Sequence, residues 1–182
     1  MSRKQLCAAQ GIEAACILFQ LNSKTAGILR LAQNAGLPPV FTTGAERARL
    51  CAEWRAFVHA AVTAGLMQHA PNSVLVGYLR QTGPLLRAAE ADTPGGCALP
   101  ESQQPAQTDF VDGPFASYMA LLGHGEQAGC PSLFCRRLAD AAPGLAAHLA
   151  QDTRVQARLA AVMALVISAI WDKLEEFEIL AD

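Results

Sequence analysis

The feature that most constrains this fold is the run LAAVMALVISAIW, from Leu159 to Trp171. It contains no charged residue and only one hydroxyl, that of Ser168. A helix that is apolar around its whole circumference has to be covered on every side. The run therefore predicts either the central helix of a bundle or a contact between subunits.

The composition favours a single helical domain over residues 1–182. The chain is 52% hydrophobic, 16% charged and only 6% aromatic, with alanine supplying much of the apolar content. Alanine has the best helix propensity, whereas aromatic and β-branched residues favour strands. We expect an all-α, single-domain bundle, orthogonal or up-down, of roughly six to eight helices around the apolar C-terminal helix, with no sheet.

Capping and breaking residues divide the chain into these helices. Ser2 predicts the start of a first helix, and the capping-box pattern Thr43-Gly44-Ala45-Glu46 predicts the start of a long helix that ends before Pro71. Gly36, followed by Pro38 and Pro39, predicts a helix end, and Asp152 or Thr153 predicts the cap of the last helix. Gly83-Pro84 predicts a break or kink. Residues 92–112 are rich in proline and glycine, so we expect a mobile loop there.

Export and membrane insertion are not expected. The apolar run is about 13 residues long, below the ~20 that a membrane span requires. The N-terminal segment after Arg3 and Lys4 is interrupted by polar residues and lacks a cleavage signal. These observations predict a cytoplasmic protein, in which the six cysteines remain reduced thiols.

Charge and motifs argue against several function classes. The formal net charge of −2 is far from the basic balance of domains that bind nucleic acid, so we expect no nucleic-acid partner. The sequence has no phosphate-binding loop, no HExxH, no GxSxG and no CxxC. We therefore expect no cofactor, and nothing in the chain calls for an enzyme.

One local cluster offers chemistry, within HGEQAGCPSLFC. His124, Cys130 and Cys135 are zinc-ligand types, but they number three and their spacing matches no common zinc finger. Cys130 precedes Pro131 at a predicted helix start, where the helix dipole lowers the pKa of a thiol. Cys130 and Cys135 are thus weak candidates for metal binding or for thiol-redox chemistry.

The leading hypothesis is a non-enzymatic interaction protein, such as an adaptor, assembly chaperone or regulatory subunit, that acts through a helical groove or a dimer face. A mean hydropathy of +0.21 is high for a soluble chain, and apolar surface left uncovered marks a partner site. We expect a protein partner and a homodimer, with the C-terminal helix contributing Val162, Val166 and Trp171 as anchors.

The alternative hypothesis is a sensor that encloses a small apolar ligand inside the bundle. Ligand pockets are lined mainly by apolar and aromatic side chains. Here the lining candidates are Trp54, Phe57, Phe115 and Tyr118. Their helical spacing is equally typical of an ordinary core, so both interpretations stay open.

Overall fold

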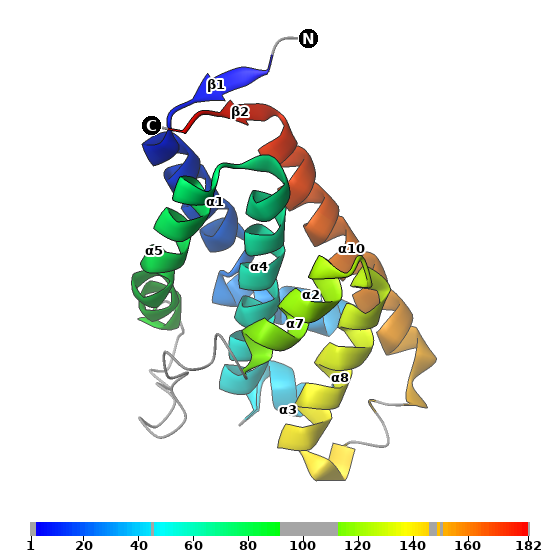
Figure 1. Cartoon of the computed structure of the whole chain (residues 1–182). Helices are drawn as coiled ribbons and strands as arrows, with labels where there is room; N and C mark the ends of the chain where they lie inside the picture. Colours follow the sequence, from blue (N-terminus) through cyan, green and yellow to red (C-terminus); the bar gives the residue numbers. More distant parts are fainter. Residues whose placement is uncertain (1–2, 45, 92–112, 146–148, 150, 182) are drawn as a thin grey trace.

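The computed structural model describes residues 3–44, 46–91, 113–145, 149 and 151–181, so the loop expected at 92–112 lies outside the described residues. The described part contains eight α-helices, two short 3-10 helices and two short strands (Figure 1). The predicted all-α, single-domain bundle is confirmed. The elements are β1 (Lys4–Leu6), α1 (Ala8–Asn22), α2 (Thr25–Ala35), α3 (Pro39–Thr42), α4 (Arg47–His69), α5 (Asn72–Ala91), α7 (Pro114–Gly123), η2 (Gln127–Gly129), α8 (Cys130–Ala141), η3 (Pro143–Leu145), α10 (Thr153–Glu175) and β2 (Phe177–Ile179).

Helix α4 runs through the middle of the bundle and contacts each of the other described α-helices (Figure 1). Its buried residues point in all directions around the helix axis and include Trp54, Phe57 and Val58. Alanine and glycine between Ala60 and Gly65 allow neighbouring helices to approach closely. The helix that the chain covers on every side is therefore α4.

Helix α10, which carries the apolar run, is packed along one face. Its buried residues recur every three or four positions and lie against α1, α2, α4 and α8. These helices pack on the C-terminal helix as predicted, but the opposite face is left exposed. The sequence predicted that this run forms either the central helix of a bundle or a contact between subunits. Because one face is exposed, the contact between subunits stays a prediction. The buried residues are Val155, Leu159, Met163, Ile167, Ile170 and Leu174.

By length and composition alone, α10 is long and apolar enough to cross a membrane. It has 23 residues and contains an 18-residue window of mean hydropathy 1.5, of which 28% is buried in the bundle. The expectation against a span counted only the uncharged run, and the helix extends beyond that run at both ends. Insertion into a bilayer would, however, withdraw Leu159, Met163 and Ile167 from the core.

The two ends of the chain meet in a parallel two-stranded sheet, where we expected no sheet. Lys4 pairs with Phe177 and Leu6 with Ile179. The first helix consequently begins after Cys7, not at Ser2. Local pattern did not reveal the strand, because its hydrogen-bond partner lies at the opposite end of the sequence.

The helix boundaries predicted from capping residues are only partly right. Asp152 caps α10 by accepting hydrogen bonds from the amides of Arg154 and Val155. The capping box at Thr43 is wrong: the N-cap residue of α4 is Glu46, and the Thr43 hydroxyl donates to the carbonyl of Pro39, 3.1 Å away. Proline begins the short helix α3, and the Pro39 carbonyl that accepts the Thr43 hydroxyl also accepts the amides of Thr43 and Gly44.

Helix α5 continues through Pro84, so of the break or kink that we expected there, the break is wrong. Proline removes one backbone donor from a helix interior. Contact with α1 and α4 along α5 offsets that loss. The packing of α5 against α1 is close at Gly77, where an added Cβ would overlap Cδ1 of Ile12.

The contact between α4 and α10 depends on the absence of a side chain at Gly65. A Cβ at this position would lie 2.7 Å from Cδ1 of Trp171 and 2.8 Å from Cδ1 of Leu174. Gly65→Ala is therefore expected to lower the free energy of unfolding by about 1–2 kcal/mol, since overpacking outweighs the gain in helix propensity. Urea unfolding measures the effect.

Gly27, inside α2, provides the matched control. Nothing lies within 4 Å of a Cβ built there, so Gly27→Ala is expected to raise the free energy of unfolding by about 0.5–1 kcal/mol. Equal stabilisation by both substitutions would show that α4 and α10 are not packed as closely as described.

Candidate functional site

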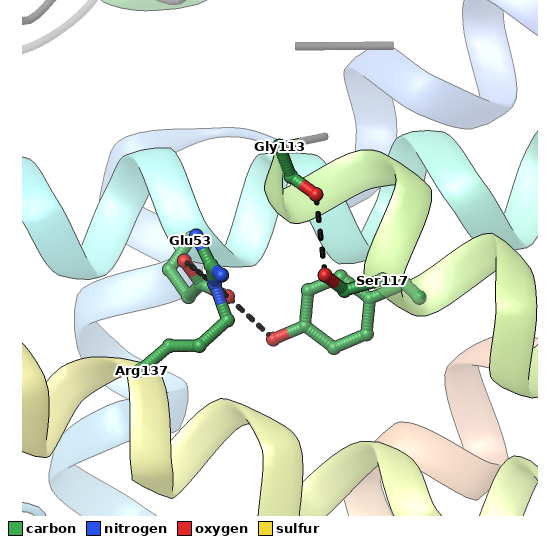
Figure 2. A network of polar contacts seen from close by, with 5 residues as sticks. Glu53, Gly113, Ser117 and Arg137 are labelled. Carbon is green, nitrogen blue, oxygen red and sulfur yellow. Dashed lines mark hydrogen bonds and ion pairs between the residues drawn. The ribbon is translucent and has the colours of Figure 1, made fainter. Parts of the chain in front are cut away.

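Glu53 on α4 carries a buried carboxylate that binds residues of two other helices. The hydroxyl of Tyr118, on α7, donates to its Oε1 at 2.7 Å. Nε of Arg137, on α8, lies 2.8 Å from Oε1 and 3.0 Å from Oε2. Figure 2 shows Arg137 reaching from its helix toward Glu53, with Ser117 bonded to the Gly113 carbonyl nearby. These bonds attach α7 and α8 to α4.

The hydrogen bond from Tyr118 to Glu53 indicates a structural role for Tyr118. Burial, together with the adjacent Glu53 carboxylate, holds the pKa of Tyr118 well above its ordinary value. The phenol therefore stays protonated and remains a hydrogen-bond donor throughout the neutral pH range. A buried carboxylate of this kind is stabilised by its charged and neutral donors together.

His59 lies six residues after Glu53 on α4, and both of its ring nitrogens are hydrogen-bonded. Its Nδ1 lies 3.0 Å from the hydroxyl of Tyr78, and its Nε2 lies 3.1 Å from Oγ1 of Thr82. Burial lowers the pKa of His59 to about 4, so the ring is neutral at pH 7. With both nitrogens hydrogen-bonded to α5, His59 has no nitrogen left to act as a base or as a metal ligand.

Arg55 is a third buried polar residue of α4, and it holds the chain where α1 turns into α2. Its Nε donates to the carbonyl of Ser23 at 3.2 Å, and Nη2 donates to Oγ1 of Thr25 at 2.9 Å. Nη2 also donates to the carbonyl of Ala89, near the end of α5, at 2.7 Å. The charge of Arg55 is thus satisfied by oxygen atoms from three segments.

Three of the four aromatic residues proposed to line a ligand pocket contact one another between α4 and α7, namely Trp54, Phe57 and Tyr118. The ring centroids of Trp54 and Phe57 are 5.2 Å apart, and those of Phe57 and Tyr118 are 5.6 Å apart. Phe115 packs on the ring of His59 with centroids 4.5 Å apart. Trp54, Phe57 and Tyr118 are core residues and Phe115 is partly buried against the core, and a ligand-binding role for the four remains a prediction.

The candidate thiols lie on α8. Cys130 and Cys135 are both free and almost fully buried, and burial raises the pKa of each to about 11. This is opposite to the lowered pKa expected at Cys130, because removing a thiolate from water costs more than the helix dipole returns. Arg137, which follows on the same helix, is engaged by Glu53.

The candidate metal ligands are not brought together. His124 is exposed, with its Nδ1 2.6 Å from the carbonyl of Ala120, whereas Cys130 and Cys135 face the core. Among the described residues, no group of three or more His, Cys, Asp or Glu side chains has an arrangement that could hold a metal ion.

The exposed side of α10 takes no part in the packing of the bundle. Between Arg158 and Asp172 every exposed residue of the helix is uncharged, and Leu165, at 69%, is the most exposed of the large hydrophobic residues described. We call this surface the outer face of α10. It consists of Ala160, Ala161, Ala164, Leu165, Ser168 and Ala169.

The residues expected to anchor a dimer lie beside this face. Val162, Val166 and Trp171 are half-buried and pack against the core, and Nε1 of Trp171 donates to the carbonyl of Ala61 at 3.0 Å. Sequence reasoning did not single out Leu165, although its position on the exposed side can be read from the sequence. Leu165 and Ala161 are four residues apart on the side opposite the buried stripe.

No known protein family, curated protein or solved structure matches the chain at a level that would indicate kinship. Fold similarity therefore contributes nothing to the functional argument. What the molecule does has to be inferred from its own surfaces and buried groups.

The buried His59 makes stability depend on pH. The unfolded chain binds a proton at this residue near pH 6.5, while the folded chain does so only near pH 4. As pH falls through this window, His59 is therefore expected to lower the free energy of unfolding by about 1.4 kcal/mol per pH unit, or about 3 kcal/mol in all. Below about pH 4 it contributes no further loss.

Chemical unfolding of the wild type and of His59→Gln at several pH values between 4 and 7 measures this contribution. The variant is expected to show the shallower pH dependence, and His124→Gln, which changes an exposed histidine, is the matched control. If His59→Gln kept the full slope of the wild type, the buried neutral state of His59 would be refuted.

Proposed function

We propose that this chain is a non-enzymatic interaction protein that binds another protein through the outer face of α10. The observation that carries the proposal is the exposed stretch between Arg158 and Asp172, which presents about four helical turns without a charge. Soluble proteins rarely expose a contiguous apolar surface without using it.

The rigidity of the bundle supports a binding role for α10. One side of the helix is fixed by the buried stripe from Val155 to Leu174, and by the hydrogen bond from Trp171 to the Ala61 carbonyl. The opposite side is thus presented on a preformed element. A preformed surface binds at a lower entropic cost than one that has to fold first.

The buried polar groups support the non-enzymatic part of the proposal. Glu53, His59 and Tyr118 would be the natural acid and base candidates, yet each is hydrogen-bonded to another helix inside the core. A catalytic group needs a pKa near the working pH and access to substrate. The pKa of His59 is lowered to about 4 and the pKa of Tyr118 is raised well above its ordinary value, so both lie far from neutral pH, as expected for residues that hold helices together.

A photocrosslinking amino acid placed at position 165 tests the proposal in cells. Leu165 lies in the middle of the outer face, and Val76, 44% exposed on α5, provides a control position that is also apolar and exposed. We expect one discrete, light-dependent adduct from position 165 that is missing from position 76. The reason is that only a surface with a resident partner keeps a second protein within bonding distance.

The identity of the adduct is read by mass spectrometry. An adduct of defined mass from position 165, abolished by Ala161→Glu on the same face, supports the outer face as the binding surface. Equal yields from positions 165 and 76, or no adduct from either, would contradict the proposal.

A further inference from the structure

We propose that the occupant of the outer face is the same face of a second copy of this chain, packed antiparallel about a two-fold axis that passes beside Leu165. The proposal rests on the proposed function and names its partner. It also commits to one arrangement, which is fixed by charge.

Charge is distributed along α10 with opposite signs at its two ends. Arg154 and Arg158 are exposed near its start, and Asp172 and Glu175 are exposed near its end. Leu165 lies seven residues from Arg158 and seven residues from Asp172. A two-fold axis at Leu165 therefore places Arg158 of each copy beside Asp172 of the other. In this arrangement the surface is complementary to itself.

The spacing of the outer face fits a helix pair. Arg158, Ala161, Leu165, Ser168 and Asp172 follow one another at intervals of three, four, three and four residues. This is the seam of two helices packed at about 20°, with the uncharged residues in its middle and the charged residues at its ends.

A parallel pair would use the same seam but would place Arg158 against Arg158 and Asp172 against Asp172. Like charges in contact suppress an arrangement even where opposite charges add little affinity. A small shift of the antiparallel register, by contrast, still brings the basic end of one helix beside the acidic end of the other. The charges thus select the antiparallel pair.

An anionic lipid surface is a poorer occupant. The end of α10 and the strand after it carry Asp172, Glu175, Glu176 and Glu178 against a single Lys173. Helices that lie on membranes carry lysine and arginine beside their apolar face, because the cytoplasmic leaflet is negative. The acidic end would be repelled from such a leaflet, whereas the basic end of a second copy attracts it.

The size of the outer face determines the dimer affinity that we expect. A helix of 23 residues is roughly 35 Å long, and one pair of such helices buries less than the ~1,600 Å² of a standard interface. Association is therefore expected to be weak, with a Kd on the order of micromolar, and to weaken as salt screens the ends. Sedimentation velocity at low salt, at protein concentrations from about 1 to 500 μM, covers the relevant range.

Two single substitutions and their combination test the arrangement. Arg158→Glu and Asp172→Arg each create like charges at both ends of the pair, so each variant alone is expected to dimerise roughly ten-fold more weakly than the wild type. The double variant Arg158→Glu/Asp172→Arg exchanges the two signs and is expected to regain the wild-type Kd. Both positions are exposed. The Arg158 guanidinium donates to the carbonyl of Asn34 at 3.4 Å within its own chain, so thermal unfolding at low concentration checks that each variant retains the fold.

Mixing the two single variants gives a second, independent reading. A heterodimer of Arg158→Glu with Asp172→Arg has opposite charges at both ends, so the equimolar mixture is expected to associate more tightly than either variant alone. Glu175 is left unchanged because it already pairs with Arg3 at 3.1 Å.

The contradicting results are equally specific. A wild type that stays monomeric throughout the concentration range, or a double variant no tighter than the single ones, overturns the antiparallel pair. If the crosslinker at position 165 nevertheless captures a different protein, the inference fails and the proposed function stands. If neither association nor crosslinking occurs, both fail.

Discussion

The burial of α4 is the constraint on which the rest of this structure depends. A helix packed on all sides has no water to satisfy its polar side chains, so each of them must find a hydrogen-bond partner inside the protein. Glu53 fixes α7 and α8, Arg55 fixes the chain between α1 and α2 and the end of α5, and His59 fixes the middle of α5. The polar groups of the central helix thus specify which neighbours surround it.

Helix α10 meets a different requirement, because only one of its faces is used inside the bundle. It joins α4 through Trp171 and the gap left by Gly65, and its end is tied by β2 to the start of the chain. These contacts hold the helix in place and leave an uncharged face outside. An apolar helix with one uncovered side exposes apolar surface to water at a cost in free energy, and this is the surface that we propose a second copy covers.

The helical class and several boundaries were predictable, because capping and periodicity are local signals. Gly36, for instance, ends α2 with a positive φ of 85°, and Asp152 begins α10. The parallel strands and the pairing of Glu53 with Arg137 were not predictable, since their partners are distant in sequence. The apolar run from Leu159 was identified correctly, but the helix covered on every side is α4. Glu53, Arg55 and His59 lower the mean hydropathy of α4, so its sequence does not look like that of a fully buried helix. Their burial is explained only by their hydrogen-bond partners in other parts of the chain.

The central claim is that α10 gives one face to its own core and the other to a second copy, and crosslinking between copies tests it most directly. In a background where Cys7, Cys16 and Cys97 are serine, a short bismaleimide is applied to Leu165→Cys and, separately, to Ala157→Cys. Antiparallel pairing places the two copies of position 165 together and those of position 157 about 24 Å apart. Covalent dimers are expected from position 165 alone. Comparable dimers from both positions, or none from either, would contradict the antiparallel pair.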